Sequence, residues 1–422
     1  MKNFRIITTY FLLFIKYVLI FAYKFDTIIL EGYYVNTIET SEQYLMKTYG
    51  RQPLAAKSGH GCVCTDEDGK QYIDFGSGIG TNSLGYCNDD WADAVCKQVR
   101  SIQHTSNYYY TAVQAEFAEK LCGITGYARM FLGNSGAEAN ECAIKLARKY
   151  SFDKYGEGRG TIITLKNSFH GRTMMTLTAT GQDVFHNFFF PFPTGFAYAE
   201  ANNIDDLKAK LDGTVCAVMM EMIQGEGGVC AMDKDFVQAA AKLCAENDIL
   251  FMVDEVQTGV GRTGTFLASE QYGVKPNVTT LAKGLGGGLP IGCCLVDEAH
   301  AEVLGGGAHG STFGGNPVVC AGALEVLKQV TADGFLDSVQ AKAKKIREAV
   351  AKCDGVTEVT GLGMMIGITL KTQDAHDIMD KARENGLLVL TAKERVRLLP
   401  PLTISDTEIE QGLKILLPLL AK

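Results

Sequence analysis

The sequence of 422 residues has few prolines and no run of five or more basic residues. Its 48 acidic and 40 basic residues give a net charge of −8, which makes nucleic acid an unfavourable partner. The 13 cysteines are odd in number and lack the paired spacing of zinc sites. We therefore expect small buried thiols in a reducing cytoplasm and no metal site.

Glycine, in contrast, is abundant. The chain has 46 glycines, about 11% of its residues against a usual level of roughly 7%. Because only 9 prolines accompany them and 46% of the residues are apolar, the chain is globular and not a low-complexity linker. The length suits two or three domains. The glycines predict tight turns and places where the backbone comes close to another group.

Residues 1–35 differ from the rest of the chain. They hold four basic and two acidic residues, a local charge of +2, and an apolar run from Phe11 to Tyr23. Lys16 interrupts this run, which is shorter than the roughly 20 apolar residues needed to span a bilayer. No small-residue cleavage site of a signal peptide follows. We expect a leader outside the fold that reflects a start assigned too far upstream; a membrane anchor and a removed signal peptide are the alternatives.

From residue 36 onward, short apolar runs alternate with helical patterns. Helices are expected over 91–102, 112–122, 137–149 and 235–247. The apolar runs are ARMFLGN (128–134), GTIITLKNS (160–168), VCAVMMEMI (215–223), ILFMVDEV (249–256), NVTTLAKG (277–284) and IGCCLVD (291–297). This alternation predicts an α/β fold with a mainly parallel sheet that helices cover on both faces. After Gly315 the pattern changes to long helices and a few strands, typical of a smaller α+β unit.

Three polar segments follow apolar runs, at the sheet edge where ligands collect. GNSGAEANE (133–141) leads into a helix, whose free N–H groups suit phosphate, although an ordinary helix cap explains it equally well. Asp254 follows a fully apolar run, where a carboxylate is costly without a cation, although a turn-forming aspartate is common there. Lys283 precedes glycines that leave space around its amine, but an isolated lysine is more often structural.

Together, the three segments match the requirements of one cofactor. Pyridoxal phosphate needs a phosphate cradle, an amine that bonds its carbonyl, and a carboxylate at its pyridine nitrogen. The carboxylate keeps this nitrogen protonated, so that the ring can accept electrons from the substrate. The sequence therefore predicts a pyridoxal-phosphate enzyme in which Lys283 is the amine and Asp254 the carboxylate.

The chain resembles the class III aminotransferases of fold type I from about Tyr49 to Leu417, and most closely the acetylornithine aminotransferases. The matching motifs are HTSNYYYT (104–111), GNSGAEANE, NSFHGRT (167–173), MIQGEGGV (222–229), VDEVQTGVGRTG (253–264), LAKGLGGGLPIG (281–292), HGSTFGGNP (309–317) and VRLLPPLTI (396–404). The resemblance implies a seven-stranded-type sheet in a large cofactor domain (85–315). A smaller α+β domain would combine residues 36–84 with 316–422.

The resemblance also implies roles for individual residues. Lys283 would hold the cofactor and move the substrate proton. The other cofactor contacts would be Asp254 at the ring nitrogen, Gln257 at the ring hydroxyl, Phe169 and Val256 on the ring faces, and Ser135, Gly136 and Ala137 at the phosphate. Thr312 of a neighbouring subunit would complete the phosphate cradle, so the resemblance implies a homodimer with shared active sites.

Two arginines dominate the implied substrate site. Arg172 would bind a substrate carboxylate by two hydrogen bonds, and Arg397 the second carboxylate of 2-oxoglutarate. Glu226 would pair with Arg397 when no dicarboxylate is bound; a fixed salt bridge is the alternative. Ser311 would touch the substrate. Ile79 stands where ornithine aminotransferases typically carry a tyrosine, which favours acetylornithine or 4-aminobutyrate over ornithine.

The expected activity is therefore transfer of the δ-amino group of N2-acetyl-L-ornithine to 2-oxoglutarate, which yields glutamate. This ping-pong reaction belongs to arginine biosynthesis in the cytoplasm. Succinylornithine, 4-aminobutyrate and ornithine remain alternative amine donors. A semialdehyde aminomutase would use the same fold and lysine without 2-oxoglutarate. A membrane-anchored binding protein with a vestigial site is the non-enzymatic alternative, and the complete set of Lys283, Asp254 and Gln257 argues against it.

Overall fold

The computed structural model describes residues 36–421, so the leader of residues 1–35 lies outside the described residues. The described chain divides into two compact units. The smaller comprises residues 36–57 and 66–68, and the larger comprises residues 58–65 and 69–421. The smaller unit contains helix α2 (Thr37–Tyr44), whose first turn is capped by the Asn36 side chain. None of the α2 residues is buried.

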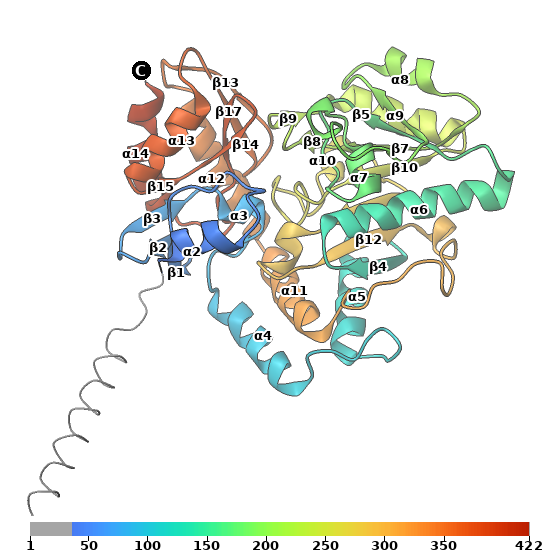
Figure 1. Ribbon diagram of the computed structural model, residues 1–422, viewed down its shortest axis with the longest axis horizontal. Coiled ribbons are helices and arrows are strands. Elements are labelled where there is room, and N and C mark those ends of the chain that lie inside the picture. The colour runs from blue at the N-terminus through green and yellow to red at the C-terminus, as the bar shows by residue number, and fades with distance from the viewer. Residues whose placement is uncertain (1–35, 422) are drawn as a thin grey trace, which may run out of the picture. The chain divides into compact units, whose positions relative to one another are not determined.

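The larger unit contains a seven-stranded sheet, which lies on the right-hand side of Figure 1. Its strands, in spatial order, are β4 (Arg129–Gly133), β12 (Gly292–Val296), β11 (Val278–Leu281), β10 (Leu250–Asp254), β7 (Val215–Glu221), β5 (Thr161–Leu165) and β6 (Phe196–Ala199). The five strands from β11 to β6 are parallel to one another. β12 is antiparallel to the strands on both of its sides, β11 and β4. The predicted α/β fold with a mainly parallel sheet is confirmed, and each of the six apolar runs contains one of its strands.

Helices cover both faces of this sheet. Alternate side chains of β7 point to opposite faces, and they belong to two different apolar clusters. Ala217 and Met219 pack with residues of α6 (Gly136–Tyr155), whereas Val218 and Met220 pack with residues of α9 (Lys234–Glu246). Because both faces are buried, β7 consists almost entirely of apolar residues, as expected of a central strand.

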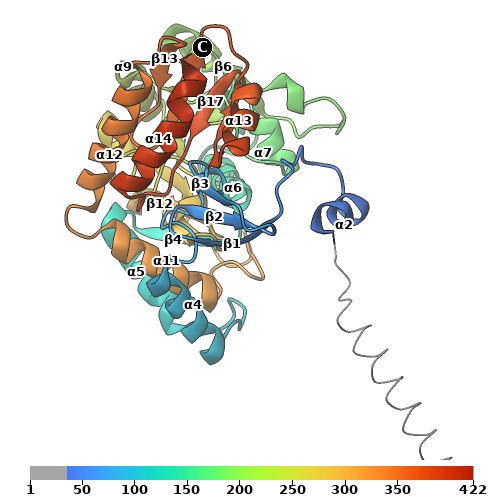
Figure 2. The same cartoon turned by 90° about the vertical axis from the view of Figure 1, so that its left-hand side faces the viewer.

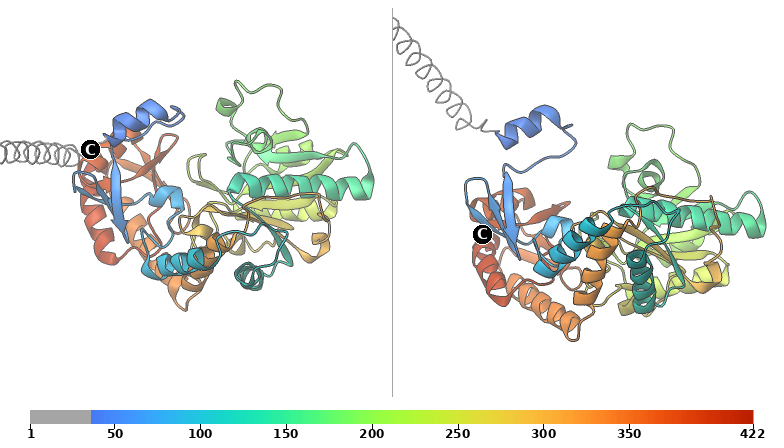
Figure 3. Two further views of the ribbon diagram at one scale, coloured as in Figure 1. Left: turned by 60° about the horizontal axis from the view of Figure 1, so that its bottom comes forward. Right: turned by 90° about the horizontal axis from the view of Figure 1, so that it is seen from below.

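Helices from distant parts of the sequence lie side by side in the larger unit. Helix α11 (Pro317–Val330) packs against α4 (Asp89–Ser101) and α5 (Ala112–Thr125), and Figure 3 shows orange α11 beside light-blue α4. Figure 2 shows α14 (Asp406–Leu420) beside α12 (Phe335–Val350) and α13 (Ala375–Glu384). The helices expected at residues 91–102, 112–122 and 235–247 are found within a few residues of these limits, and the one expected at 137–149 extends to Tyr155.

Three smaller sheets complete the described fold. They have the strand orders β1-β2-β3-β15, β13-β14-β17-β16 and β8-β9. Their bounds are β1 (Ala56–His60), β2 (Val63–Asp66), β3 (Gln71–Asp74), β15 (Leu387–Leu388), β13 (Val356–Thr360), β14 (Ile366–Leu370), β17 (Arg395–Leu398), β16 (Leu390–Ala392), β8 (Ile223–Gln224) and β9 (Cys230–Ala231). β15, near the C-terminus, pairs in parallel with β3, near the N-terminus. The domain limits at residues 85 and 316 remain predictions.

Several short helices lie in the connections. They are α3 (Ser77–Gly80), α7 (Met174–Ala179), α8 (Ile204–Lys210), α10 (Ser269–Tyr272), η1 (Asp183–Phe185), η2 (Lys283–Gly286) and η3 (Glu298–His300). All 13 cysteines belong to the described residues and are free thiols. Eight of them are buried, as expected, but Cys87 and Cys96 are exposed. Within residues 36–421, no helix has both the length and the apolar character needed to cross a membrane.

Candidate active site

A cavity of about 440 Å³ opens where the parallel strands end. Its wall is made by residues that follow β4, β5, β7, β10 and β11, together with Thr81 and the segment that follows η2. Since the carboxyl ends of parallel strands meet at one sheet edge, this is the expected place for a ligand. The cavity brings together most of the residues that the sequence singles out.

The N-terminus of α6 forms one wall. Ser135 caps this helix, and Gly136 and Ala137 are its first residues. Their N–H groups precede the first complete turn, so they have no carbonyl within the helix to bond. A side chain at position 136 would come within 2.7 Å of a Val256 methyl group, so glycine is required there. Free N–H groups at the positive end of a 20-residue helix favour phosphate.

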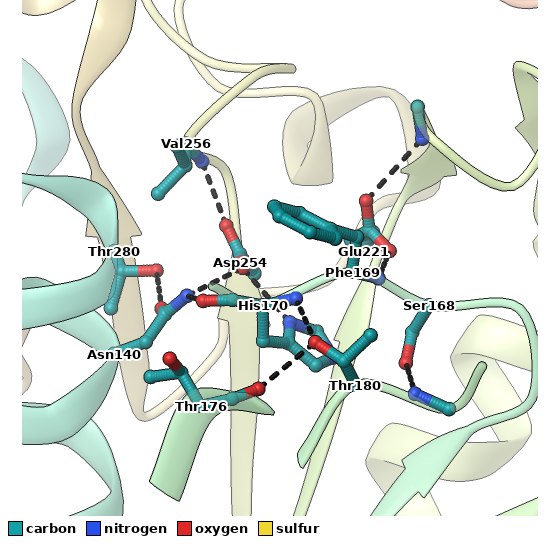
Figure 4. Close-up of polar contacts among 12 residues, drawn as sticks. Asn140, Ser168, Phe169, His170, Thr176, Thr180, Glu221, Asp254, Val256 and Thr280 are labelled. Carbon is teal, nitrogen blue, oxygen red and sulfur yellow. Dashed lines mark hydrogen bonds and ion pairs between the residues drawn. The ribbon is translucent and has the colours of Figure 1, made fainter. Parts of the chain in front are cut away.

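Asp254 ends β10 at the floor of the cavity and is 4% exposed. Its Oδ2 accepts hydrogen bonds from Asn140 Nδ2 at 2.7 Å and His170 Nδ1 at 2.9 Å (Figure 4). Its Oδ1 accepts one from the Val256 N–H at 3.0 Å. Asn140 is itself fixed, because its Oδ1 accepts from Thr280 on the adjacent strand. Three donors therefore hold this buried carboxylate in a single orientation.

Two further titratable groups surround Asp254. Burial disfavours the charge on His170, but the hydrogen bond to Asp254 and the negative charges of Asp254 and Glu221 together outweigh this effect and raise the pKa of the imidazole. Glu221 ends β7, directly opposite Asp254 in the sheet register. Burial raises the pKa of Glu221 to about 8, and Asp254 adds to this shift while His170 opposes it. The floor of the cavity therefore contains an imidazole and a carboxyl group whose pKa values are both raised by their surroundings.

Lys283 lies across the cavity, two residues after β11 ends. It opens the short helix η2 with a φ of 42°, in the left-handed region that non-glycine residues seldom adopt. Burial lowers the pKa of Lys283, while the negative charge of Glu226 opposes this shift. A neutral amine is a nucleophile and a proton acceptor, so this position suits covalent binding of a carbonyl and proton transfer.

Phe169, Val256 and Gln257 line the same cavity. The Phe169 N–H donates to Glu221 at 2.9 Å, which fixes the backbone that carries the ring. The Gln257 Oε1 is buried and has no hydrogen-bond partner among the described residues. Since an unpaired buried acceptor is costly, it indicates that a ligand donor completes the site.

Arg172 and Arg397 have different surroundings. Arg172 lines the cavity and is exposed, with its guanidinium 5.5 Å from the Phe169 ring centre and 4.1 Å from that of Phe185. Arg397 is 3% exposed, and its Nη1 donates to Glu226 Oε1 at 2.6 Å. Burial favours neutral Glu226, but the charge and hydrogen bond of Arg397, with smaller contributions from Lys283 and Gln257, outweigh this effect and lower the pKa of the glutamate. The expected pair of Glu226 with Arg397 is therefore present.

Ser311, Thr312 and Arg397 do not line the cavity; Arg397 contacts it through Glu226, its hydrogen-bond partner. Ser311 contacts Asn134, a residue that lines the cavity: the Ser311 Oγ accepts a hydrogen bond from Asn134 Nδ2 at 3.1 Å. Thr312 is exposed and lines a separate small pocket with His104 and Gln114. Within one chain, the structure does not bring Thr312 to the phosphate cradle.

Comparison with known proteins agrees with this geometry. The family profile "Aminotransferase class-III" matches residues 44–420. An acetylornithine aminotransferase from Haemophilus ducreyi is 48% identical over 381 residues, which cover 90% of this chain and 97% of the relative. The chain belongs to the class III aminotransferases.

Solved structures of aminotransferases also match this class III chain. The N-acetylornithine aminotransferase from Stenotrophomonas maltophilia is 35% identical, with a TM-score of 0.79 and coverage of 91% of this chain and 98% of that one. An ornithine aminotransferase from Toxoplasma gondii, with PLP at partial occupancy in its active site, is 30% identical. Its TM-score is 0.88, with coverage of 94% of this chain and 97% of that one. The fold is that of fold type I, as predicted from the sequence.

Pyridoxal phosphate is the cofactor of this class, and the cavity fits it. The α6 N-terminus suits the phosphate, and the close approach of Gly136 to Val256 is the kind of cradle that a Cβ would fill. The unpaired Gln257 Oε1 suits the ring hydroxyl, Asp254 the ring nitrogen, and Lys283 the carbonyl carbon. The ring would lie between Phe169 and Val256.

Three buried polar residues were missed from the sequence: Asn140, His170 and Glu221. Asn140 lies inside a helix and His170 inside the motif NSFHGRT, so neither interrupts an apolar run. Glu221 interrupts the run VCAVMMEMI, in the same way that Asp254 interrupts its own. That interruption could have identified Glu221.

Proposed function

We propose that this aminotransferase transfers the δ-amino group of N2-acetyl-L-ornithine to 2-oxoglutarate and forms glutamate in a ping-pong reaction. The observation that carries the proposal is a pair of arginines: among the described residues, Arg172 lines the cavity without an ion-pair partner, whereas Arg397 pairs with Glu226, which lines the same cavity. The name of the 48% identical Haemophilus relative supports the choice of amine donor. The reaction would serve arginine biosynthesis in the cytoplasm.

The two arginines suit two substrates of different charge. Both N2-acetyl-L-ornithine and 2-oxoglutarate carry a carboxylate that Arg172 can bind by two parallel hydrogen bonds. Only 2-oxoglutarate has a second carboxylate, which would displace Glu226 from Arg397. With the amine donor, Glu226 remains in place, so that Arg397 does not become a buried unpaired charge.

The remaining residues supply orientation and proton transfer. Pyridoxal phosphate, when bound, acts as an electron sink for the substrate carbon that loses its proton. Lys283 has its pKa lowered by burial, and it is the group placed to take that proton and return it. Asp254, held by Asn140, His170 and the Val256 N–H, would keep the ring nitrogen protonated.

We also propose that the enzyme is a homodimer with shared active sites. Thr312 is exposed and lies outside the cavity of its own chain. The neighbouring Tyr108, Tyr110 and Phe313 are large exposed side chains that a second subunit would cover. In such a dimer, Thr312 of one subunit would reach the phosphate of the other.

A panel of amine donors with 2-oxoglutarate tests the function. We expect kcat/KM for N2-acetyl-L-ornithine to exceed that for ornithine, 4-aminobutyrate and succinylornithine by at least about tenfold, or roughly 1.4 kcal/mol. Lys283→Ala should abolish turnover with every donor. If another donor gives a higher kcat/KM, that donor is the substrate and the proposal is wrong. Turnover of a semialdehyde without 2-oxoglutarate would indicate an aminomutase.

A further inference from the structure

Two aromatic rings face the guanidinium of Arg172. The Arg172 Cζ lies 4.1 Å from the centre of the Phe185 ring and 5.5 Å from that of Phe169. The two rings meet edge to face, with centres 5.9 Å apart and an angle of 71° between their planes. Phe169 is predicted to contact the face of the cofactor ring. The cofactor does not explain the aromatic residue at position 185.

Arg172 lacks the carboxylate partner that Arg395 and Arg397 have. In the part of the chain that the structure describes, no ion pair and no hydrogen bond involves its guanidinium. Arg397, the other substrate arginine, is paired with Glu226 at 2.6 Å. A flexible, exposed arginine with no partner would normally lose its orientation, so the contact with aromatic rings is what holds Arg172 in place.

The backbone fixes Phe185 next to Phe169. Ser168 immediately precedes Phe169, its Oγ accepts from the Gly181 N–H at 3.0 Å, and its carbonyl accepts from Gln182 Nε2 at 3.0 Å. The Gln182 carbonyl in turn accepts from the Phe185 N–H at 3.0 Å. These bonds link the segment that carries Phe185 to the segment that carries Phe169, so the two rings are held as a pair.

The next residue anchors the same turn from its other side. His186 Nε2 lies at hydrogen-bonding distance, 2.9 Å, from the Leu177 carbonyl of α7. Phe185 is half-buried, whereas Val184 and Phe188 on either side are 67% and 83% exposed. In this exposed loop, therefore, Phe185 is the aromatic residue whose ring is turned toward the active site.

We propose that Phe185 is a positioning residue for substrate recognition: its ring orients the Arg172 guanidinium while leaving the charge and the N–H donors of Arg172 free for a substrate carboxylate. This inference rests on the proposed role of Arg172 as the carboxylate-binding residue. An aromatic face attracts the cation through its quadrupole without neutralising it. An acidic neighbour would orient the arginine equally well, but it would compete with the substrate for the same donors.

The two arginines would then be prepared in different ways. Arg172 is oriented by aromatic faces and is ready for a carboxylate in both half-reactions. Arg397 is neutralised by Glu226 and becomes available only when the second carboxylate of 2-oxoglutarate replaces the glutamate. Positioning of Arg172 should therefore affect the binding of both substrates alike.

Steady-state kinetics of Phe185→Leu test the proposal, because leucine keeps an apolar side chain and removes the aromatic face. We expect KM for both 2-oxoglutarate and the amine donor to rise about three- to tenfold, while kcat changes less than about twofold. The inhibition constant of glutarate, a dicarboxylate that cannot react, should rise by a similar factor. Phe185→Tyr, which restores the ring, should return all three constants to near the wild-type values.

Phe188→Leu is the matched control, since Phe188 lies on the same loop, is exposed and is not one of the two rings that face Arg172. Unchanged KM values and an unchanged glutarate constant in Phe185→Leu would overturn the proposal, as would an equal effect in Phe188→Leu. Phe185→Met provides the same test if the leucine variant does not fold. Arg172→Ala tests the role of Arg172 separately from that of Phe185. If this variant leaves both KM values unchanged, Arg172 does not bind the substrate carboxylate.

Discussion

The Glu221 carboxylate connects two loops that carry site residues. It accepts a hydrogen bond from the Phe169 N–H at 2.9 Å (Figure 4). It also accepts one from the Gly225 N–H at 3.3 Å, and Glu226 follows Gly225 directly. A buried carboxyl with a pKa of about 8 binds a proton in the folded protein between its ordinary pKa of about 4.5 and pH 8, whereas the unfolded chain does not. Protonation of Glu221 therefore contributes to the free energy of unfolding. This contribution is complete below pH 4.5 and is lost as the pH rises to 8.

We therefore predict that Glu221→Gln, a permanently neutral isostere, removes this pH dependence. Each unit of pKa shift corresponds to about 1.4 kcal/mol, so the wild-type free energy of unfolding should fall more steeply than that of the variant between pH 5.5 and 8.5. Urea titrations at several pH values measure this difference. Glu116→Gln, at an exposed position of α5, is the control and should follow the wild type. Parallel curves for Glu221→Gln and the wild type would contradict the prediction.

At the scale of elements, Gly136 decides how closely α6 approaches the loop after β10. A Cβ on Gly136 would lie 2.7 Å and 2.8 Å from the two methyl groups of Val256, so Gly136→Ala must move the helix or the valine. We predict that this variant binds pyridoxal phosphate about tenfold more weakly, as measured by fluorescence titration of the apoenzyme. Gly123→Ala in α5 is the control, because a Cβ there meets nothing within 4 Å. Equal cofactor affinity of the two variants would contradict the role of Gly136.

Much of the sheet can be predicted because its strands are apolar runs between helical patterns. β6 was missed because this edge strand has only four residues, three of them half-buried, so its apolar run FAYA is too short to identify a strand. The antiparallel direction of β12 was also not predicted, since a buried strand has the same composition in either direction. Asp254 and Lys283 stood out because they end apolar runs, whereas the partners of Asp254 come from α6 and from the loop after β5.

At the scale of the whole molecule, the proposed dimer makes a prediction about mixed subunits. Lys283→Ala subunits lack the amine and should be inactive; Thr312→Ala subunits should bind the cofactor weakly. In a hybrid dimer of the two, one site combines an intact Lys283 with an intact Thr312 from the other subunit. The hybrid can be isolated after co-expression of the two variants with different affinity tags. At limiting cofactor, its activity should therefore exceed the mean activity of the Lys283→Ala and Thr312→Ala homodimers. A hybrid no more active than that mean would exclude sharing of Thr312.

The antiparallel direction of β12 also limits how Lys283 can move. After β11 the chain turns back into the same sheet within ten residues, and no crossover helix intervenes. The Gly284 and Gly286 carbonyls of this turn accept hydrogen bonds from Ser83 and Trp91, at 2.9 Å and 3.2 Å. The backbone of Lys283 is thus held by strand β11 before it and by these two hydrogen bonds after it. The reach of its amine therefore comes from its four methylene groups. If Lys283 transfers the substrate proton as proposed, rotation about its side-chain bonds is sufficient and no loop movement is required.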